Sequence, residues 1–436
     1  MSSLIKYSLL FGIVPSLFLF SISKETGASK MKNKTPVAAC TQEDDQKLAA
    51  AICQYLSAND SLNKKYLEPL KNYSTEKVES FIASEQFTAY RLRQNKDSVF
   101  TGVVHETITV AGKDTIKDKE YAYTGIVPAN YNADKQYSLI IHLHGMGRTG
   151  DKYIDTWQKV FEETKADNYI LICPTYPESN WSSKTGERIA LTLMKKIKTI
   201  YNINDTRIFL TGMSRGGGGT YNISKFHTDL FAGIAPISGA TDFENKALLL
   251  ENFVPVPVYI IHGSKDNFVP VEYARNVYKK LQDLKCDVTY IEHDKVYEKM
   301  PSIGGHFYPT ELLSDLVKWF DTKKRKGLPT KLFIYQTKNH HDRIYWLNAE
   351  TLSKDTASIE GEIKNNRVEI KTDGVKQIKI FLNKELINFS QPVYFIVNNK
   401  EISKKTLKPD VGILIKNYKK HIDKEMLFTA EVVLDL

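Results

Sequence analysis

The sequence predicts an α/β fold, with a doubly wound and mostly parallel sheet, an N-terminal helical segment and a C-terminal β-sandwich domain. Between residues 101 and 325, short apolar runs alternate with helical stretches, as in a parallel sheet that carries helices on both faces. A glycine-rich turn, Gly212–Gly216, separates one of these runs from the helix that follows it. After residue 329, apolar and polar residues alternate in short runs, which is typical of strands with one buried face.

The alternating segment gives the order of the expected elements. Strands are expected at 101–110, 120–127, 137–144, 169–173, 207–211, 232–237, 256–262 and 287–292. Helices are expected at 153–165, 187–201, 217–226, 271–284 and 311–323. The first two strands are expected to form an antiparallel edge. Open α/β sheets place their sites at and beyond the carboxyl ends of the strands, so a site is expected in those loops.

The turn Gly212–Gly216 fits the pattern G-x-S-x-G, in which a serine stands at the tip of a tight strand-to-helix turn. Glycines flank the serine because side chains there would collide with each other or with neighbouring strands. Ser214 is therefore a candidate nucleophile. The pentapeptide alone fits an ordinary glycine-rich turn equally well, so its interpretation depends on the residues that follow.

A serine nucleophile needs a histidine base and a carboxylate that orients it, in the chain order Ser, Asp or Glu, His. Asp266 follows the buried-strand pattern of 256–262 in a short polar loop, and it is predicted to be the acid. Asp242 is a weaker candidate because no comparable glycine turn precedes it. Glu251 is also weaker, because it follows a leucine run that indicates a helix.

The predicted base is His306, which lies in the glycine-rich loop 302–309 before the last helix of the alternating segment. The loop glycines would let the histidine reach back over the sheet. His293 is the second choice. The chain therefore contains a serine, an acid and a base in the required order.

A second glycine turn follows the strand 137–144 and is expected to supply an oxyanion hole. The backbone N–H groups of Met146 and of Arg215, the residue after the nucleophile, are predicted to bind the developing oxyanion. His142 and His144 share one face of this strand and could be read as metal ligands. No third ligand is evident, so no metal is expected and His144 is expected to brace the loop.

Together with several neighbouring segments, these motifs resemble a known family. Residues from about 101 to 325 resemble an α/β-hydrolase of the secreted bacterial esterase kind, related to feruloyl and acetyl-xylan esterases and to phospholipase/carboxylesterase-like enzymes. The resemblance is carried by the segments Thr211–Gly217, Leu230–Gly239, His262–Asp266 with Val269-Pro270, and Gly304–His306. It implies a doubly wound sheet and a serine mechanism that needs neither metal nor cofactor. The strands after residue 329 resemble the accessory β-domain of some of these proteins.

The predicted function is therefore a serine carboxylic ester hydrolase that acts through an acyl-enzyme on feruloyl or acetyl saccharides or related esters. Tyr176, Glu178 and Trp181, in the loop after the strand 169–173, are expected to form a substrate wall. One alternative is a serine peptidase of the prolyl-oligopeptidase type. Another is a non-catalytic glycan-binding protein that keeps a relict hydrolase fold. The expected partner is a small-molecule or polysaccharide-linked ester substrate.

The composition suits a folded protein, with 42% hydrophobic and 11% aromatic residues. The formal net charge is +9, but the lysines are spread along the chain and no nucleic-acid-binding motif is present, so nucleic acid is not expected as a partner. Residues 1–23 are predicted to be a signal peptide or a retained N-terminal anchor, followed by a linker over 24–40. The protein is accordingly expected to be secreted or periplasmic, with no membrane contact beyond that segment.

Three further regions complete the expected domain organisation. Residues 41–95 form a helical segment that either packs as an appendage or covers part of the active-site rim, and Cys40 and Cys53 bracket one of its helices as a possible disulfide. Residues 96–327 form the catalytic domain. Residues 328–436 form the sandwich, in which helices are expected to stop, and Trp346 is expected in the core rather than on a sugar-binding face. A chain truncated after Lys326 is expected to keep the catalytic residues.

Overall fold

The computed structural model describes residues 29–30, 43–58, 63–112, 118–240 and 249–436. The signal peptide or anchor expected over 1–23 and most of the linker expected over 24–40 lie outside the described residues. Cys40 and Asp242 also lie outside them, so the Cys40–Cys53 disulfide stays a prediction. No helix among the described residues is both long enough and apolar enough to span a membrane.

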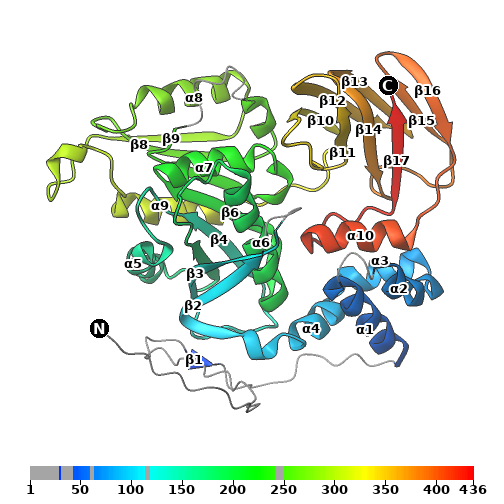
Figure 1. Ribbon diagram of the computed structural model, residues 1–436, viewed down its shortest axis with the longest axis horizontal. Helices are drawn as coiled ribbons and strands as arrows, with labels where there is room; N and C mark the ends of the chain where they lie inside the picture. Colours follow the sequence, from blue (N-terminus) through cyan, green and yellow to red (C-terminus); the bar gives the residue numbers. More distant parts are fainter. Residues whose placement is uncertain (1–28, 31–42, 59–62, 113–117, 241–248) are drawn as a thin grey trace, which may run out of the picture.

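A nine-stranded sheet forms the centre of the molecule (Figure 1). Its order is β1 (Ser29–Lys30), β2 (Phe100–Val110), β3 (Lys119–Val127), β5 (Tyr169–Pro174), β4 (Tyr137–Leu143), β6 (Ile203–Met213), β7 (Gly233–Ile237), β8 (Val258–Gly263) and β9 (Val288–His293). Neighbouring strands from β5 to β9 are parallel. The pairs β2–β3 and β3–β5 are antiparallel, so the expected antiparallel edge is confirmed.

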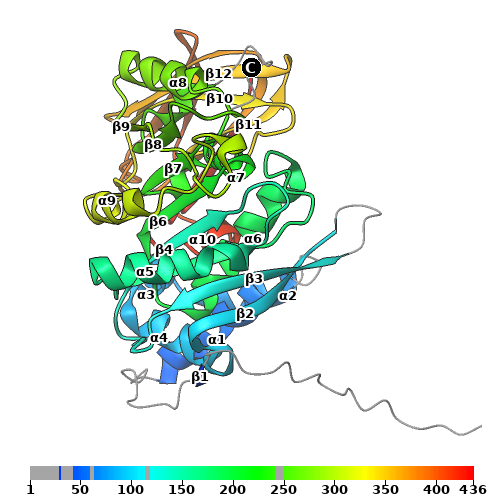
Figure 2. The same ribbon diagram turned by 90° about the vertical axis from the view of Figure 1, so that its left-hand side faces the viewer.

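Helices cover both faces of this sheet. On one face lie α5 (Ile154–Thr164) and α9 (Thr310–Asp321), and this face is turned toward the viewer in Figure 2. On the other lie α6 (Lys184–Ile200), α7 (Arg215–Ser224) and α8 (Glu272–Asp283). Alternate residues of β4 serve the two layers: Ile140 packs with α5 and α9, whereas Leu139 and Ile141 belong to the core on the α6 side. The sheet is thus doubly wound.

The N-terminal helices form a hydrophobic cluster that is separate from the two core layers of the sheet. They comprise α1 (Glu43–Ser57), α2 (Asn63–Leu67), α3 (Thr75–Ala83) and α4 (Glu85–Arg93), with a 3-10 turn, η2 (Glu68–Asn72), between α2 and α3. Their apolar stripes are buried together with one face of α10 (Val411–His421), a helix near the C-terminus. Figure 1 shows these helices beside α10. The segment therefore packs as an appendage that joins the two ends of the chain.

The C-terminal region contains two sheets, which is consistent with the expected β-sandwich. The larger has the order β10 (Lys331–Thr337), β12 (Thr356–Lys364), β13 (Arg367–Asp373), β15 (Val393–Val397) and β16 (Lys400–Lys405). The smaller has the order β11 (Leu347–Leu352), β14 (Val375–Leu382) and β17 (Ala430–Asp435). Trp346 is fully buried and its Nε1–H donates to the carbonyl oxygen of Pro329 at 2.7 Å, so it is a core residue.

The expectation that helices stop after residue 329 is wrong, because α10 lies between β16 and β17. Asp410 caps this helix by accepting the backbone N–H of Ile413 at 2.8 Å. Its buried residues Val411, Leu414, Ile415 and Tyr418 have helical spacing. This pattern was present in the sequence, but the helix is stabilised by packing against α3 and η2, which come from the opposite end of the chain.

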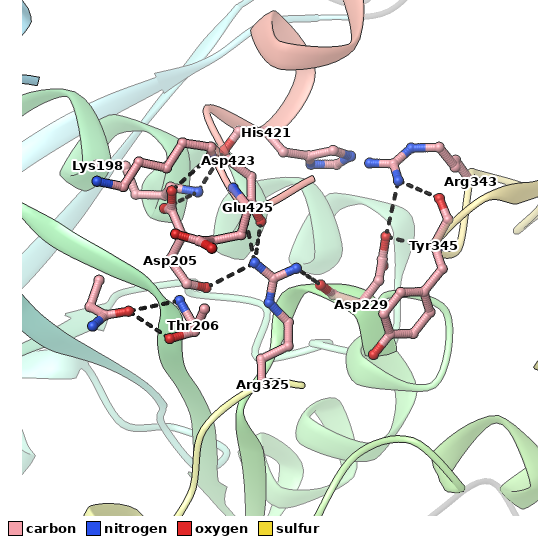
Figure 3. Close-up of polar contacts among 12 residues, drawn as sticks. Lys198, Asp205, Thr206, Asp229, Arg325, Arg343, Tyr345, His421, Asp423 and Glu425 are labelled. Atoms are coloured by element: carbon pink, nitrogen blue, oxygen red, sulfur yellow. Dashed lines mark hydrogen bonds and ion pairs between the residues drawn. The ribbon is translucent and has the colours of Figure 1, made fainter. Parts of the chain in front are cut away.

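A buried network of charged groups joins the C-terminal part of the chain to the part that forms the large sheet (Figure 3). Lys198 of α6 pairs with Asp205 of β6 at 2.8 Å and also donates to the carbonyl oxygen of His421 at 2.8 Å. Arg325, in the connection between α9 and β10, pairs with Asp423 at 2.8 Å. These side chains are all almost completely buried, and they come from both sides of the domain junction.

Candidate active site

Ser214 stands at the turn between β6 and α7, in a strained backbone conformation with φ 57° and ψ −116°. Positive φ is unfavourable for a residue with a Cβ, so the surrounding packing must hold it. Gly212 and Gly216 allow this packing. A Cβ on Gly212 would lie 2.5 Å from the carbonyl oxygen of Gly216, and a Cβ on Gly216 would lie 2.0 Å from that of Leu143. The glycines of the motif are therefore required by close backbone contacts.

His306 connects Ser214 to Asp266. Its Nε2 lies 2.8 Å from Oγ of Ser214, and its Nδ1 lies 2.7 Å from Oδ2 of Asp266. Because an ionised carboxylate only accepts hydrogen bonds, Nδ1 carries the proton and Nε2 is left to accept the serine O–H. The structure thus brings together the three predicted side chains, which lie far apart in the sequence, in the geometry that activates a hydroxyl.

Asp266 is held as a carboxylate by the loop around it. Its Oδ1 accepts the backbone N–H groups of Phe268 and Val269 at 2.9 and 2.8 Å. Burial alone would raise the pKa of Asp266, but hydrogen bonds from His262, His306 and the backbone outweigh burial and hold the pKa below its ordinary value. Asp266 is therefore charged at neutral pH.

Glycines fix the loop that carries His306 against the loop that carries Asp266. The N–H of Gly305 donates to the carbonyl oxygen of Lys265 at 2.7 Å. Gly304 has φ +59°, and a Cβ there would lie 2.0 Å from the same oxygen. Only glycine fits this position without displacing the backbone.

The alternative acid and base have other surroundings. Glu251, at the start of the 3-10 turn η6 (Leu250–Phe253), forms an ion pair with Lys280 at 3.2 Å. His293 is buried, and its ring packs against Phe307 with 5.3 Å between the ring centroids. Neither residue is joined to Ser214 by the contacts found among the described residues.

The turn that follows β4 is braced on both sides of Gly145. Its N–H donates to the hydroxyl of Tyr153 at 3.1 Å, and its carbonyl oxygen accepts from Nδ1 of His144 at 2.8 Å. Nε2 of His144 accepts the N–H of Tyr176 at 2.9 Å. The expected bracing role of His144 is consistent with these contacts. A Cβ on Gly145 would be 3.5 Å from Cβ of Ser214, so this turn lies beside the serine.

His142 lies beneath the turn among aromatic rings. Its ring centroid is 4.4 Å from that of Tyr153 and 5.2 Å from that of Tyr308. Burial lowers the pKa of His142 to about 3, with a further lowering from His144, so the ring is neutral. Among the residues that the structure describes, no group of three or more His, Cys, Asp or Glu side chains is arranged to hold a metal ion.

A cleft of about 380 Å³ opens at Ser214. Its lining residues are Ser179, Asn180, Trp181, Ser182, Ser214, Arg215, Gly218, Ala240 and Val269. Trp181 thus borders the cleft, although it is only 1% exposed, and its ring centroid lies 5.4 Å from that of Tyr176, which is not one of the lining residues. Glu178 has a different environment: it is exposed and pairs with Lys119 at 3.2 Å. The geometry places one of the three expected wall residues in the cleft.

Phe268 is a site residue that sequence reasoning missed. Its side chain is 63% exposed, and its ring centroid lies 5.3 Å from that of His306. An exposed aromatic ring next to a base offers an apolar face to a substrate. Its position two residues after Asp266 was the available signal, but nothing in the sequence showed that its ring faces His306.

Comparison with known proteins gives matches that overlap this site. Residues 182–310 match the Phospholipase/Carboxylesterase family model. The chain is 26% identical over 215 residues to a probable feruloyl esterase C of Aspergillus oryzae, covering 47% of this chain and 74% of that protein. It is 28% identical over 215 residues to a probable feruloyl esterase C of Aspergillus flavus, with the same coverage.

Among solved structures, a thermostable esterase is similar over 51% of this chain and 63% of that chain, with 26% identity and a TM-score of 0.44. The two relatives named above are fungal, so the expected bacterial and secreted character stays a prediction. The residues matched by the family model contain the serine turn, Asp266, His306 and the strands β6 to β9 of the large sheet. The chain therefore contains an esterase of the α/β-hydrolase type.

Proposed function

We propose that this esterase hydrolyses carboxylic esters through Ser214, His306 and Asp266, and that aromatic acyl esters of saccharides, such as feruloyl esters, are its substrates. The observation that carries the proposal is the hydrogen-bonded chain from Ser214 through His306 to Asp266, with contacts of 2.8 and 2.7 Å, at a strained turn. The catalytic domain, 96–327, supplies all three residues.

In this mechanism Nε2 of His306 accepts the hydroxyl proton as Oγ of Ser214 attacks the acyl carbon. Backbone N–H groups of Met146 and Arg215 bind the oxyanion of the tetrahedral intermediate. His306 then gives the proton to the leaving alcohol, and an acyl-enzyme remains on Ser214. Water, activated by the same base, releases the acid and restores the hydroxyl. Asp266 keeps the proton on Nδ1 and stabilises the imidazolium.

Two observations support an aromatic acyl group. The two Aspergillus relatives described above are named as probable feruloyl esterases. In addition, the exposed ring of Phe268 offers a stacking surface beside the base His306. Stacking of this kind would favour a feruloyl group over an acetyl group.

The proposal is tested with the full chain by fluorophosphonate labelling and a substrate panel. We expect labelling of the wild-type protein and no labelling of Ser214→Ala, together with hydrolysis of methyl ferulate and p-nitrophenyl acetate. Turnover of aminoacyl or prolyl anilides without ester hydrolysis would favour a peptidase of the prolyl-oligopeptidase type. Absence of both labelling and turnover would favour a relict fold that binds glycans.

We also propose that residues 1–23 direct export and that cleavage releases the mature chain. The support is the uncharged apolar run from Tyr7 to Ser23 after Lys6. N-terminal sequencing of protein from the native host tests this. An intact Met1 on a membrane-bound protein would favour the anchor instead.

A further inference from the structure

A second histidine lies beside the acid of the site. His262 is on β8, four residues before Asp266, and its side chain is completely buried. Its Nε2 lies 2.8 Å from the carbonyl oxygen of Val269 and 3.4 Å from Oδ2 of Asp266. Both neighbours of Nε2 are acceptors, so this nitrogen carries the proton and faces them as a donor.

Two hydrogen bonds of Val269 therefore hold the loop from Asp266 to Val269. The N–H of Val269 binds Oδ1 of Asp266 at 2.8 Å, while its carbonyl oxygen accepts from His262. Oδ2, the carboxylate oxygen that faces His306 at 2.7 Å, also faces His262 at 3.4 Å. One carboxylate oxygen therefore lies between two imidazoles, and the loop that carries the carboxylate is held by one of them.

We propose that His262 is a positioning residue for the reaction: it fixes the orientation of Asp266 and, through Asp266, that of His306. This rests on the roles proposed above for Ser214, Asp266 and His306. The donor at Nε2 limits rotation of the carboxylate and keeps Oδ2 directed at Nδ1 of His306. Orientation of this kind matters because small displacements of a catalytic base reduce the rate strongly.

The alternative is a core histidine with no role beyond filling space. The contacts of Nε2 with Asp266 and with the carbonyl oxygen of Val269 argue against it, and they are made although Nδ1 of His262 has no hydrogen-bond partner among the described residues. Burying an unpaired polar atom costs stability, and an apolar residue of similar size would avoid that cost. The contacts of Nε2 supply the compensating interaction. His293 on the neighbouring strand has neither ring nitrogen paired among the described residues, and so it is the matched control.

The test compares two amide substitutions in the full chain, with methyl ferulate as substrate. His262→Gln places an amide N–H near the position of Nε2, whereas in His262→Asn the amide stops one methylene short. We expect kcat to fall about tenfold in His262→Asn, with KM within about twofold, and to recover most of its value in His262→Gln. His293→Asn should leave kcat within about twofold of wild type.

A double-mutant cycle with Asp266→Asn separates positioning from a general structural role. If His262 acts through Asp266, His262→Asn should change kcat by less than about twofold when Asp266 is already Asn. Equal losses in both backgrounds, or equal kcat in the Gln and Asn variants, would overturn the inference. If His262→Asn does not fold, His262→Leu replaces it in the cycle. Ser214→Ala is assayed in parallel, because activity retained there would refute the proposed function rather than this inference.

Discussion

The guanidinium group of Arg325 binds both carboxylate oxygens of Asp423, at 3.0 and 2.8 Å, where the connection from α9 meets the segment after α10. The same guanidinium donates to the backbone carbonyl oxygens of Asp229 and Asp205, at 2.9 and 3.2 Å. Arg325 thus contacts two catalytic-domain segments and one C-terminal segment at once. Because the pair is buried, removing either charge leaves the other without its ion-pair partner in a medium of low dielectric constant.

Asp423→Asn should therefore destabilise the protein by about 3–5 kcal/mol. The matched control is Asp373→Asn, which removes an exposed pair with Lys354 and should change stability by about 0–1 kcal/mol. Urea unfolding of both variants, followed by tryptophan fluorescence, measures the difference. An Asp423→Asn midpoint equal to that of the control would show that the buried pair does not hold the junction.

Stability should also decrease in acid, because folding lowers the pKa values of the carboxyl groups of Asp423 and Glu187. Burial would raise the pKa of Asp423, but the charges of Arg325 and Lys198 outweigh it and lower the pKa. Burial would likewise raise the pKa of Glu187, but hydrogen bonds from His227 and His340 outweigh it. A folded-state pKa below the unfolded value gives stability that is complete above the unfolded pKa and is lost as pH falls.

The loss should begin as the pH falls through about 4, near the unfolded pKa values of these carboxyl groups. Thermal melts between pH 7 and pH 3 measure it, and Asp423→Asn should show a smaller decrease over this range than wild type. A melting temperature that is flat or rises below pH 4 would contradict the assignment of these carboxylates as stabilising charges.

Truncation after Lys326 should be more damaging than the sequence suggested. It removes Asp423 from Arg325, and it removes α10 from the buried cluster that it shares with the N-terminal helices. It also breaks the paired hydrogen bonds between Asn252 and the backbone of Tyr335, at 2.6 and 2.9 Å. We expect the truncated chain to aggregate or to melt non-cooperatively. A soluble truncated chain with a cooperative melt and full activity on p-nitrophenyl acetate would show that the sandwich is a separable accessory.

Replacing Asp266 by Asn should reduce kcat on the order of 10⁴-fold with the fold retained, because asparagine can stabilise the wrong tautomer of His306 and carries no charge. Ser214→Ala should cost more, since no other nucleophile replaces the hydroxyl. Steady-state kinetics with methyl ferulate, together with circular dichroism, check both. Near wild-type activity in Asp266→Asn would require another acid.

Phe268→Ala should affect aromatic and small acyl groups differently. The exposed ring is expected to stack on a feruloyl group, and aromatic pairs contribute about 0.5–1.5 kcal/mol beyond the area that they bury. We therefore expect kcat/KM for methyl ferulate to fall about threefold to tenfold, with little change for p-nitrophenyl acetate. Equal losses on the two esters would indicate a role in the loop of Asp266 instead of substrate contact. Phe268→Tyr, which keeps the ring, is the matched control.

Much of the catalytic domain could be predicted from local patterns. The apolar runs gave β4, β5 and β8 to within a residue or two, and the glycine turns marked the ends of the strands where the site lies. The order Ser214, Asp266, His306 limited the choice of acid and base to a few residues. These features are encoded locally, because strand burial and tight turns depend on residues that are close in sequence.

The tertiary structure decided what depends on residues far apart in the chain. The helix α10 is buried against helices that precede it by more than three hundred residues, and Arg325 pairs with Asp423 only because the C-terminal part packs against the large-sheet domain. The ring of Phe268 likewise acquires its neighbour His306 only when two loops meet. Sequence periodicity reports which face of an element is buried, but not which distant side chain covers it.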